Sequence, residues 1–247
     1  MNASPDAQLR LLDLAEIDAE LTRLEHRRRS LPEHEQLTAL EQRDRELRDE
    51  LATLDAREGD LRREQSKAEG DVEQVRTRID RDRTRLEAGQ VSSPRELENL
   101  QSEIESLHRR QSDLEEVVLD VMERREETQS RQAAAAAERT QIVADAAAAK
   151  ERRDVALAEI GEQSGKAADR RLAVVADEPA DLLDLYERLR VSHGGVGAAA
   201  LRRGRCEGCH LSLNTVDLNA MRSAPVDEVL RCEECRRILV RTAESGL

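Results

Sequence analysis

The four cysteines near the C-terminus are the residues whose type and spacing indicate chemistry most strongly. They form two Cys-x-x-Cys pairs, Cys206 with Cys209 and Cys232 with Cys235, and 22 residues separate the pairs. Each pair can direct two thiolates at one metal ion, and two pairs complete a tetrahedral Zn²⁺ site with no position left for water. A closed site of this kind contributes to folding and not to catalysis. We therefore predict one structural zinc ion held by all four cysteines.

A redox role for the Cys-x-x-Cys pairs is the competing interpretation. Such a dithiol usually accompanies a thioredoxin-like βαβ pattern, and the sequence contains none. His210 follows a predicted ligand, but the four cysteines already fill the coordination sphere. We expect His210 to be a surface residue.

Short β-strands are expected around the cysteine pairs. Apolar stretches at 198–202, 228–231 and 238–241 suit strands, and a turn of helix fits 215–222. These elements predict a small β-rich zinc ribbon over residues 198–247. A short helix with Tyr186 and then a linker are expected over residues 179–197, with Tyr186 packing where the ribbon begins.

The rest of the chain has the composition of long helices. The whole chain contains no Trp or Phe and a single Tyr, and charged residues make up 38% of it. A globular core normally uses aromatic side chains for much of its buried area, so their absence indicates a core only one or two residues wide.

Apolar residues recur with the 3,4 spacing of a coiled coil in two long stretches. One runs from Leu37 to Leu86 and the other from Leu97 to Ile160. Between them, Gly89 and the sequence Ser93-Pro94-Arg95-Glu96 predict a turn at 88–94 and a capped new helix. We predict a mainly α protein whose residues 1–178 form a long antiparallel two-helix hairpin. Its arms span about 6–88 and 94–176, and Pro32 kinks or breaks the first arm.

The register of this hairpin follows from placing Leu86 opposite Leu97 across the turn. Two acidic seam positions then face two basic ones, Asp44 opposite Arg139 and Glu58 opposite Arg125. Ile160 falls near Leu24. Opposite charges at facing seam positions support the antiparallel arrangement, because they were not used to choose the register.

Arginines are the candidate residues for binding a partner or nucleic acid. The net charge is −13, so wrapping of DNA along the acidic helices is not expected. Two local basic groups remain. Those of the ribbon are Arg202, Arg203, Arg205, Arg236 and Arg237, and those near the hairpin turn are Arg76, Arg78, Arg83 and Arg85. The simpler interpretation of the second group is that it forms ion pairs with acidic residues along the helices.

The sequence argues against a membrane protein, a secreted protein and an enzyme. No apolar run reaches the roughly 20 residues needed to span a bilayer, and no signal-peptide pattern is present, so a cytoplasmic protein is expected. No arrangement of residues suited to nucleophilic or acid–base catalysis is recognisable, and a two-helix rod offers little concavity for a small-molecule substrate. We predict that the protein is not an enzyme.

Two stretches of sequence resemble a bacterial family of coiled-coil hairpin proteins with a C-terminal four-cysteine zinc ribbon. The first is SPRELENLQSEIESL at 93–107, and the second comprises GRCEGCHLSL at 204–213 with CEECRRILV at 232–240. Much of this family has no known function, while some members bind an alternative sigma factor or a messenger RNA. The resemblance implies an adaptor role. The family usually has Gly at the position of Arg236, so this residue bears on the turn of the second cysteine pair.

Two functions follow from these observations. The first is a zinc-binding adaptor that binds a protein partner, such as part of the transcription machinery, through its ribbon and rod. The alternative is an RNA- or DNA-binding protein that uses the arginines of the ribbon and the hairpin turn. A third reading is a purely architectural spacer.

Overall fold

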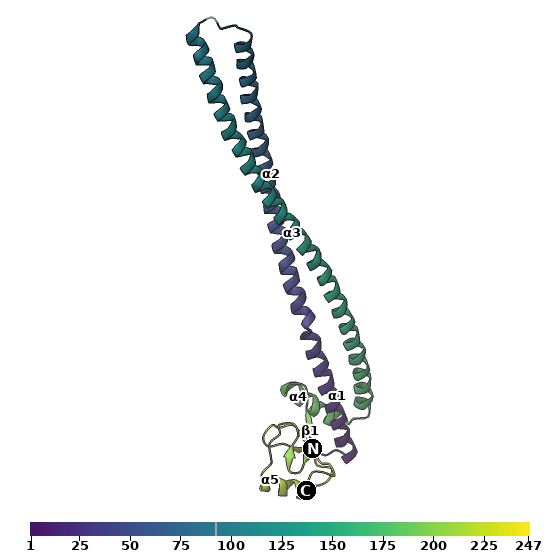
Figure 1. Ribbon diagram of the computed structural model, residues 1–247. Coiled ribbons are helices and arrows are strands. Elements are labelled where there is room, and N and C mark those ends of the chain that lie inside the picture. The colour runs from purple at the N-terminus through teal and green to yellow at the C-terminus, as the bar shows by residue number, and fades with distance from the viewer. Residues whose placement is uncertain (92) are drawn as a thin grey trace. The chain divides into compact units, whose positions relative to one another are not determined.

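The computed structural model describes residues 1–91 and 93–247, and long helices dominate it (Figure 1). The elements are α1 (Pro5–Arg29), α2 (Pro32–Glu87), α3 (Pro94–Ala176), α4 (Ala180–Ser192), β1 (Ala198–Arg202), β2 (Arg205–Cys206), α5 (Thr215–Ser223), β3 (Leu230–Arg231) and β4 (Ile238–Val240). None of the helices in these ranges combines the length and apolar character that a membrane crossing requires. The chain divides into two compact units. We call residues 35–149 the hairpin unit and residues 1–34 with 150–247 the ribbon unit.

The hairpin unit is an antiparallel pair formed by α2 and the first part of α3. Its buried side chains recur at heptad spacing, as predicted: Leu47, Leu54, Leu61, Ala68, Val72 and Ile79 on α2, and Leu100, Leu114, Val121 and Ala135 on α3. The apolar seam is one or two residues wide, which explains why the chain folds without Trp or Phe.

Two ion pairs confirm the predicted register of the hairpin unit. Arg139 Nε lies 2.9 Å from Asp44 Oδ1, and Arg125 Nη2 lies 2.6 Å from Glu58 Oε1. Both pairs join seam positions on opposite helices. The fold is therefore the mainly α hairpin that the sequence predicts.

The turn of the hairpin is bounded by sequence signals at both ends. α2 ends at Glu87, and Gly89 follows with a φ of 62°, a left-handed conformation that glycine adopts without strain. α3 begins at Pro94, and the amide of Glu96 donates to the Ser93 hydroxyl at 3.4 Å, which is the predicted cap. Ser92, within the predicted turn at 88–94, lies outside the described residues.

In the ribbon unit, α1 ends before Pro32 instead of bending around it. The last helical residue is Arg29, and the Ser30 amide donates to the His26 carbonyl at 2.9 Å. Leu31 is buried in a cluster with Leu24 and Ile160, so the predicted proximity of Leu24 and Ile160 is confirmed. Apolar packing of Leu31 therefore holds the chain at the break between α1 and α2.

The zinc ribbon contains a sheet of four short strands in the order β2-β1-β4-β3. β1 and β4 are parallel, whereas β2 and β3 run antiparallel to their neighbours. β1 has the predicted bounds, β3 and β4 are shorter than predicted, and α5 extends the predicted helical turn by one residue. Asn214 caps α5 by accepting from the Asp217 amide at 2.8 Å.

The two faces of this sheet bury different cores, as the alternation of a strand requires. Ala198, Ile238 and Val240 pack with α1 and α4 around Tyr186, the only aromatic residue. Leu201 and Leu239, on the other face, pack with the cysteines. The helices of the ribbon unit therefore form part of the support for the metal-binding module.

A buried polar network stabilises the helical side of the ribbon unit. The Tyr186 hydroxyl donates to Asp18 Oδ2 at 2.7 Å, and Arg171 Nε lies 2.7 Å from Asp18 Oδ1. Burial, followed by the hydrogen bond to Asp18, raises the pKa of Tyr186 well above its usual value. The network joins α1, α3 and α4, and it places Tyr186 against the ribbon as expected.

The N-terminal residues extend the ribbon, which the sequence did not predict. The Ala3 amide donates to the Asp227 carbonyl at 2.8 Å, and the Val229 amide donates to the Met1 carbonyl at 3.1 Å. An antiparallel bridge between Asn2 and Glu228 lies between these bonds. The ribbon is thus completed by a segment more than 220 residues away in sequence.

Candidate metal centre

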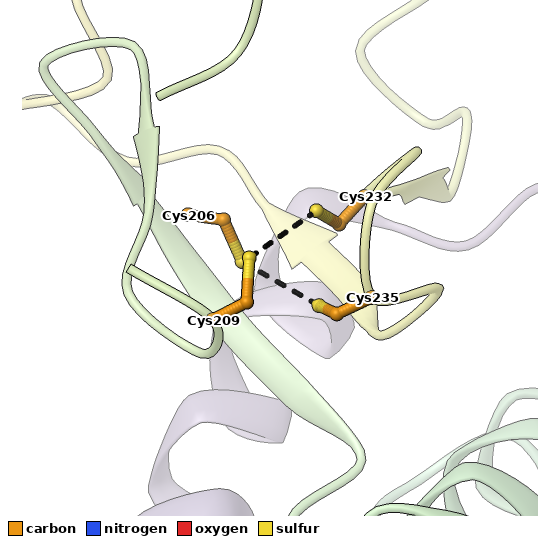
Figure 2. Close-up of side chains that lie close together, drawn as sticks. All are labelled: Cys206, Cys209, Cys232 and Cys235. Atoms are coloured by element: carbon orange, nitrogen blue, oxygen red, sulfur yellow. Dashed lines mark hydrogen bonds between the residues drawn. The ribbon is translucent and has the colours of Figure 1, made fainter. Parts of the chain in front are cut away.

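The four cysteine side chains converge on one point, as Figure 2 shows. Their Sγ atoms all lie within 4.8 Å of one another. Cys206 Sγ is 3.9 Å from Cys235 Sγ, and Cys209 Sγ is 3.8 Å from Cys232 Sγ. A tetrahedron with Zn–S bonds of about 2.3 Å has edges of about 3.8 Å. The four sulfurs therefore fit one zinc ion, and they are too far apart for disulfides.

The two cysteine pairs lie on turns with the same hydrogen bonds. The amide of His210 donates to the Cys206 carbonyl at 2.8 Å, and the amide of Arg236 donates to the Cys232 carbonyl at 2.8 Å. Cys206 is the last residue of β2, and Cys232 directly follows β3, so the sheet positions the first cysteine of each pair. The first turn carries an additional N–H···S contact of 3.4 Å from Gly208 to Cys206.

The residue after each pair has a left-handed backbone conformation. His210 has a φ of 60° and Arg236 a φ of 61°. Glycine is the residue best suited to this conformation, which gives a physical reason for the Gly that the resembling family usually carries at the position of Arg236. Arg236 nevertheless adopts the same turn as His210, so the second cysteine pair keeps its geometry. His210 is exposed, as predicted.

An arginine before each pair fixes the turn that follows. Arg205 Nε donates to the His210 carbonyl at 2.7 Å, and Arg231 Nε donates to the Arg236 carbonyl at 2.9 Å. Arg231 was not among the predicted site residues. The repeated Arg-Cys-x-x-Cys sequence was the signal that could have revealed this shared role.

The environment of the sulfurs sets which thiols hold their protons in the absence of metal. Burial raises the pKa of Cys206 to about 12 and also raises the pKa of Cys232. Burial acts in the same direction on Cys235, but hydrogen bonds from the Arg237 backbone and side chain outweigh it and lower the pKa to about 7. Zinc, which binds thiolates, must therefore displace protons when it binds.

Arg237 supports the metal site through its side-chain hydrogen bonds. Its guanidinium donates to three backbone carbonyls, at 2.9 Å to Val196, 3.2 Å to Gly208 and 3.1 Å to His193. A Cβ at Gly208 would lie 3.0 Å from Arg237 Cδ and 2.9 Å from Ala199 Cβ, so this approach requires glycine. Arg237 therefore has a structural role, and partner binding by this residue stays a prediction.

The other predicted ribbon arginines lie on the surface with local contacts. Arg202 Nε is 2.9 Å from Glu244 Oε2, and Arg236 Nη1 is 3.3 Å from Glu233 Oε2. The amide of Arg203 donates to the Glu244 carbonyl at 2.8 Å, while its side chain is exposed. Exposed pairs of this kind contribute little to stability and can exchange partners.

The predicted arginines near the hairpin turn divide into two groups. Arg76 lies 2.7 Å from Glu115, and Arg78 pairs with Glu103. Arg83 and Arg85 are exposed and form no ion pair with any residue in 1–91 or 93–247. The simpler interpretation, pairing along the helices, therefore holds for half of this group.

Comparisons with known proteins match both parts of the chain. Residues 14–194 match the CT398-like coiled coil hairpin domain, and residues 205–239 match the C4-type zinc ribbon domain. An uncharacterized protein of Mycobacterium tuberculosis is 39% identical over 241 residues, which cover 98% of each chain. An uncharacterized protein of Mycobacterium leprae is 30% identical over 222 residues, covering 90% of this chain and 94% of the relative.

Experimental structures from other bacteria have the same fold. A structure from Mycobacterium smegmatis has a TM-score of 0.82 and 36% identity, and the match covers 98% of this chain and all of the other. CT398 from Chlamydia trachomatis matches with a TM-score of 0.71, 19% identity and coverage of 96% and 98%. The HP0958 protein from Helicobacter pylori has a TM-score of 0.52, 17% identity and coverage of 97% and 98%. At these identities the last two comparisons concern the fold alone.

Proposed function

The chain belongs to the family of CT398-like coiled-coil hairpin proteins and carries a C4-type zinc ribbon, and we propose that it is a non-enzymatic adaptor that binds a protein partner. The closed metal site supports this proposal. Four thiolates fill the coordination sphere of zinc, so no position remains for a water molecule or a substrate. Cysteines that form no disulfide suit a reducing compartment, and we propose that the adaptor is cytoplasmic.

The observation that carries the proposal is the outer edge of β3. Arg231 pairs with Ile238 of β4, but the Ile238 amide donates to Gly197 on the opposite side at 3.0 Å. The pair is therefore of the non-hydrogen-bonded kind, and the main-chain N–H and C=O of Arg231 face the outer edge. Neither group has a hydrogen-bond partner among the described residues.

A groove of about 600 Å³ runs between this edge and α5. Met221 and Leu230 are buried at its base, and Ala220 of α5 and Ala224, the residue after α5, also line it. Residues 1–3 already add an antiparallel strand to the same edge at 227–229, so the edge is compatible with strand addition. We propose that an extended segment of the partner continues this strand past Arg231 and inserts an apolar side chain into the groove.

The nucleic-acid alternative has less support from the ribbon. Arg237 is engaged with three carbonyls, and Arg205 holds the first cysteine turn. Arg83, Arg85 and Arg203 are the predicted residues whose side chains form no ion pair or hydrogen bond in the described part of the chain. The free arginines therefore lie mainly near the hairpin turn, and the experiment below includes nucleic-acid binding there as an outcome.

The proposal is tested by filling the groove on α5. Ala220→Arg places a long side chain in the groove, whereas Asn219→Arg adds the same side chain to the neighbouring exposed position of the same helix. Tagged full-length protein, these two variants and Cys232→Ser are used to capture partners from the native host, with half of each sample treated with nuclease. Zinc content is measured for each variant.

We expect to capture a protein partner whether or not the sample is treated with nuclease. Asn219→Arg should still capture this partner. Ala220→Arg should not capture it, although its zinc remains bound. Cys232→Ser should lose the same protein together with zinc. Recovery of RNA or DNA alone, removed by nuclease and by Arg83→Gln with Arg85→Gln, would replace the adaptor with the nucleic-acid alternative. Equal capture of the partner by Ala220→Arg and Asn219→Arg would exclude this groove as the binding site.

A further inference from the structure

An apolar groove on the hairpin unit stands out because Leu119, a largely exposed apolar residue of α3, lines it, and Met122 follows on the same face of the helix. Leu119 and Met122 of α3 are 59% and 39% exposed. Together with the buried Val72 of α2 and the half-buried Val118, Leu119 lines a groove of about 420 Å³ between the two helices. The seam is already complete here, since Val121 and Val72 are buried. The exposed pair therefore adds nothing to the hairpin itself.

The position of these residues beside the seam suits a third helix. Leu119 and Met122 are three residues apart and lie on one face of α3. Flanking positions of a two-stranded coiled coil are usually charged, and apolar residues there extend the buried surface to another strand. An exposed apolar strip next to a complete seam therefore has the character of surfaces that bind a helix in a groove.

The rim of the groove is acidic. Glu69 and Glu73 line it from α2 and Glu115 from α3. Glu116 and Glu123 lie three residues before and four residues after Leu119, so they share its face of the helix. The single basic residue of the groove lining, Arg76, lies 2.7 Å from Glu115 and is neutralised by it.

Several of these carboxylates have no cationic partner in the part of the chain that the structure describes. Glu73, Glu116 and Glu123 form no ion pair with any residue in the two described ranges. A second copy of this chain would bring the same carboxylates against each other, which is electrostatically unfavourable. A basic helix would instead place its cations opposite them.

We infer that this groove binds an amphipathic helix of a partner protein, with an apolar face flanked by Lys or Arg. The inference rests on the proposed adaptor function and assigns the hairpin its own contact with the partner, separate from the ribbon edge. Apolar side chains of the helix contact Val72, Val118, Leu119 and Met122. The basic flanks pair with the free glutamates and favour this orientation over others.

Two synthetic peptides serve as probes. Both are helices of about three heptads with Leu at the two core positions, one with Lys and the other with Glu at the flanking positions. Binding to the full-length chain is followed by fluorescence anisotropy. Leu119→Gln is compared with Val143→Gln, which alters another exposed apolar residue of α3, 51% exposed and outside the groove.

The Lys peptide should bind saturably, with Kd about tenfold higher for Leu119→Gln and unchanged for Val143→Gln. The Glu peptide should bind at least about tenfold more weakly, because it meets like charges. Glu73→Gln with Glu116→Gln should weaken the Lys peptide. Asp71→Asn with Asp113→Asn is the matched control, since it removes the same charge at the same height but beside the opposite edge of the seam.

Three results would overturn the inference: no saturable binding of the Lys peptide, equal affinity for both peptides, or equal weakening by Leu119→Gln and Val143→Gln. Concentration-dependent dimers of the chain that disappear with Leu119→Gln would show that a second copy covers the groove. If the peptide assay fails but Ala220→Arg still abolishes capture of the partner, the inference about the hairpin groove alone has failed and the adaptor function stands. Failure of both assays would remove the adaptor function as well.

Discussion

The zinc ribbon and the hairpin unit reach stable folds by opposite means. In the ribbon, strands of two to five residues and a small apolar core converge on one point, where four sulfurs meet. In the hairpin unit, buried side chains repeat along two helices, and each layer of the seam contacts only the layers next to it. Stabilisation is concentrated in the first and distributed in the second.

This difference predicts different responses to a single substitution. A module whose strands cannot bury enough apolar surface depends on its metal for folding, so loss of one ligand acts on all of it. A layered coiled coil loses one layer at a time, because each side chain contacts mainly its neighbours along the seam. The effects below test that contrast, from the largest to the smallest.

Cys232→Ser should have the largest effect, because structural zinc sites of this class bind with about 10–16 kcal/mol at neutral pH. We expect bound zinc to fall from one per chain to nearly none, with loss of amide-exchange protection across residues 198–247. The helical circular dichroism of the hairpin unit should be retained. Atomic emission for zinc and mass-spectrometric hydrogen exchange measure the two effects.

Removal of zinc from the unaltered protein with a chelator is the control, and it should reproduce the exchange pattern of Cys232→Ser. Protection of the ribbon that persists after complete metal removal would mean that its apolar core is sufficient. The contrast between concentrated and distributed stabilisation would then be wrong.

Leu54→Ala should have a smaller and local effect. Leu54 is buried in the seam, and its truncation leaves a cavity that costs about 2–5 kcal/mol. Hydrogen exchange should increase within a few turns of residue 54, while zinc content and ribbon protection stay unchanged. Ala52→Gly, at an exposed position of the same helix, tests for a general loss of helicity of about 1 kcal/mol. Global unfolding with zinc loss would contradict the layered description.

Glu187→Gln should change stability in a pH-dependent way. Burial acts to raise the pKa of Glu187, but hydrogen bonds from Arg171 and Arg190 outweigh it and hold the pKa below its usual value. The ionised carboxylate therefore stabilises the ribbon unit at neutral pH, and this contribution is lost as the pH falls through the lowered pKa. The side chain is one-third exposed, so we expect no more than about 1 kcal/mol at pH 7.

Urea titrations at pH 7 and near pH 3 measure this effect, and the difference between wild type and Glu187→Gln should vanish at the lower pH. Glu58→Gln provides the counterpart in the hairpin unit. A hydrogen bond from Arg125 lowers the pKa of Glu58, so its effect should fade in the same direction. A difference that persists in acid would show that shape, and not charge, is what Glu187 contributes.

The sequence predicted most where one periodic signal decides the structure. Heptad spacing specified both helices, and the facing charges Asp44 with Arg139 and Glu58 with Arg125 specified their register. The paired Cys-x-x-Cys motifs specified the metal ligands because tetrahedral zinc chemistry admits few other arrangements. In each case local chemistry was sufficient.

Contacts between distant segments were not predictable in the same way. Residues 1–3 pair with 227–229 through main-chain bonds, which leave no mark on side-chain types. Arg237 looked like a surface cation, but three carbonyls brought together by the fold enclose its guanidinium. Repetition was the overlooked signal at Arg231, since an arginine precedes both cysteine pairs.

The smallest effect concerns the second cysteine turn. Arg236 has a φ of 61°, which glycine adopts without the steric penalty of a Cβ. Arg236→Gly should therefore stabilise the zinc-bound ribbon, by at most about 1 kcal/mol, because glycine also gains entropy in the unfolded chain. The exposed ion pair with Glu233, 3.3 Å in length, is lost and offsets little of this gain.

Arg236→Ala separates the two contributions, because it removes the ion pair and keeps the Cβ. Thermal unfolding of the zinc-bound protein should show a higher Tm for Arg236→Gly and an unchanged or lower Tm for Arg236→Ala. His210→Gly should behave like Arg236→Gly, since His210 has a φ of 60° in the equivalent turn. Equal Tm values for Arg236→Gly and Arg236→Ala would mean that bound zinc fixes the turn and that the backbone preference of residue 236 no longer matters. The ribbon would then depend on its metal even more than the comparison with the hairpin unit implies.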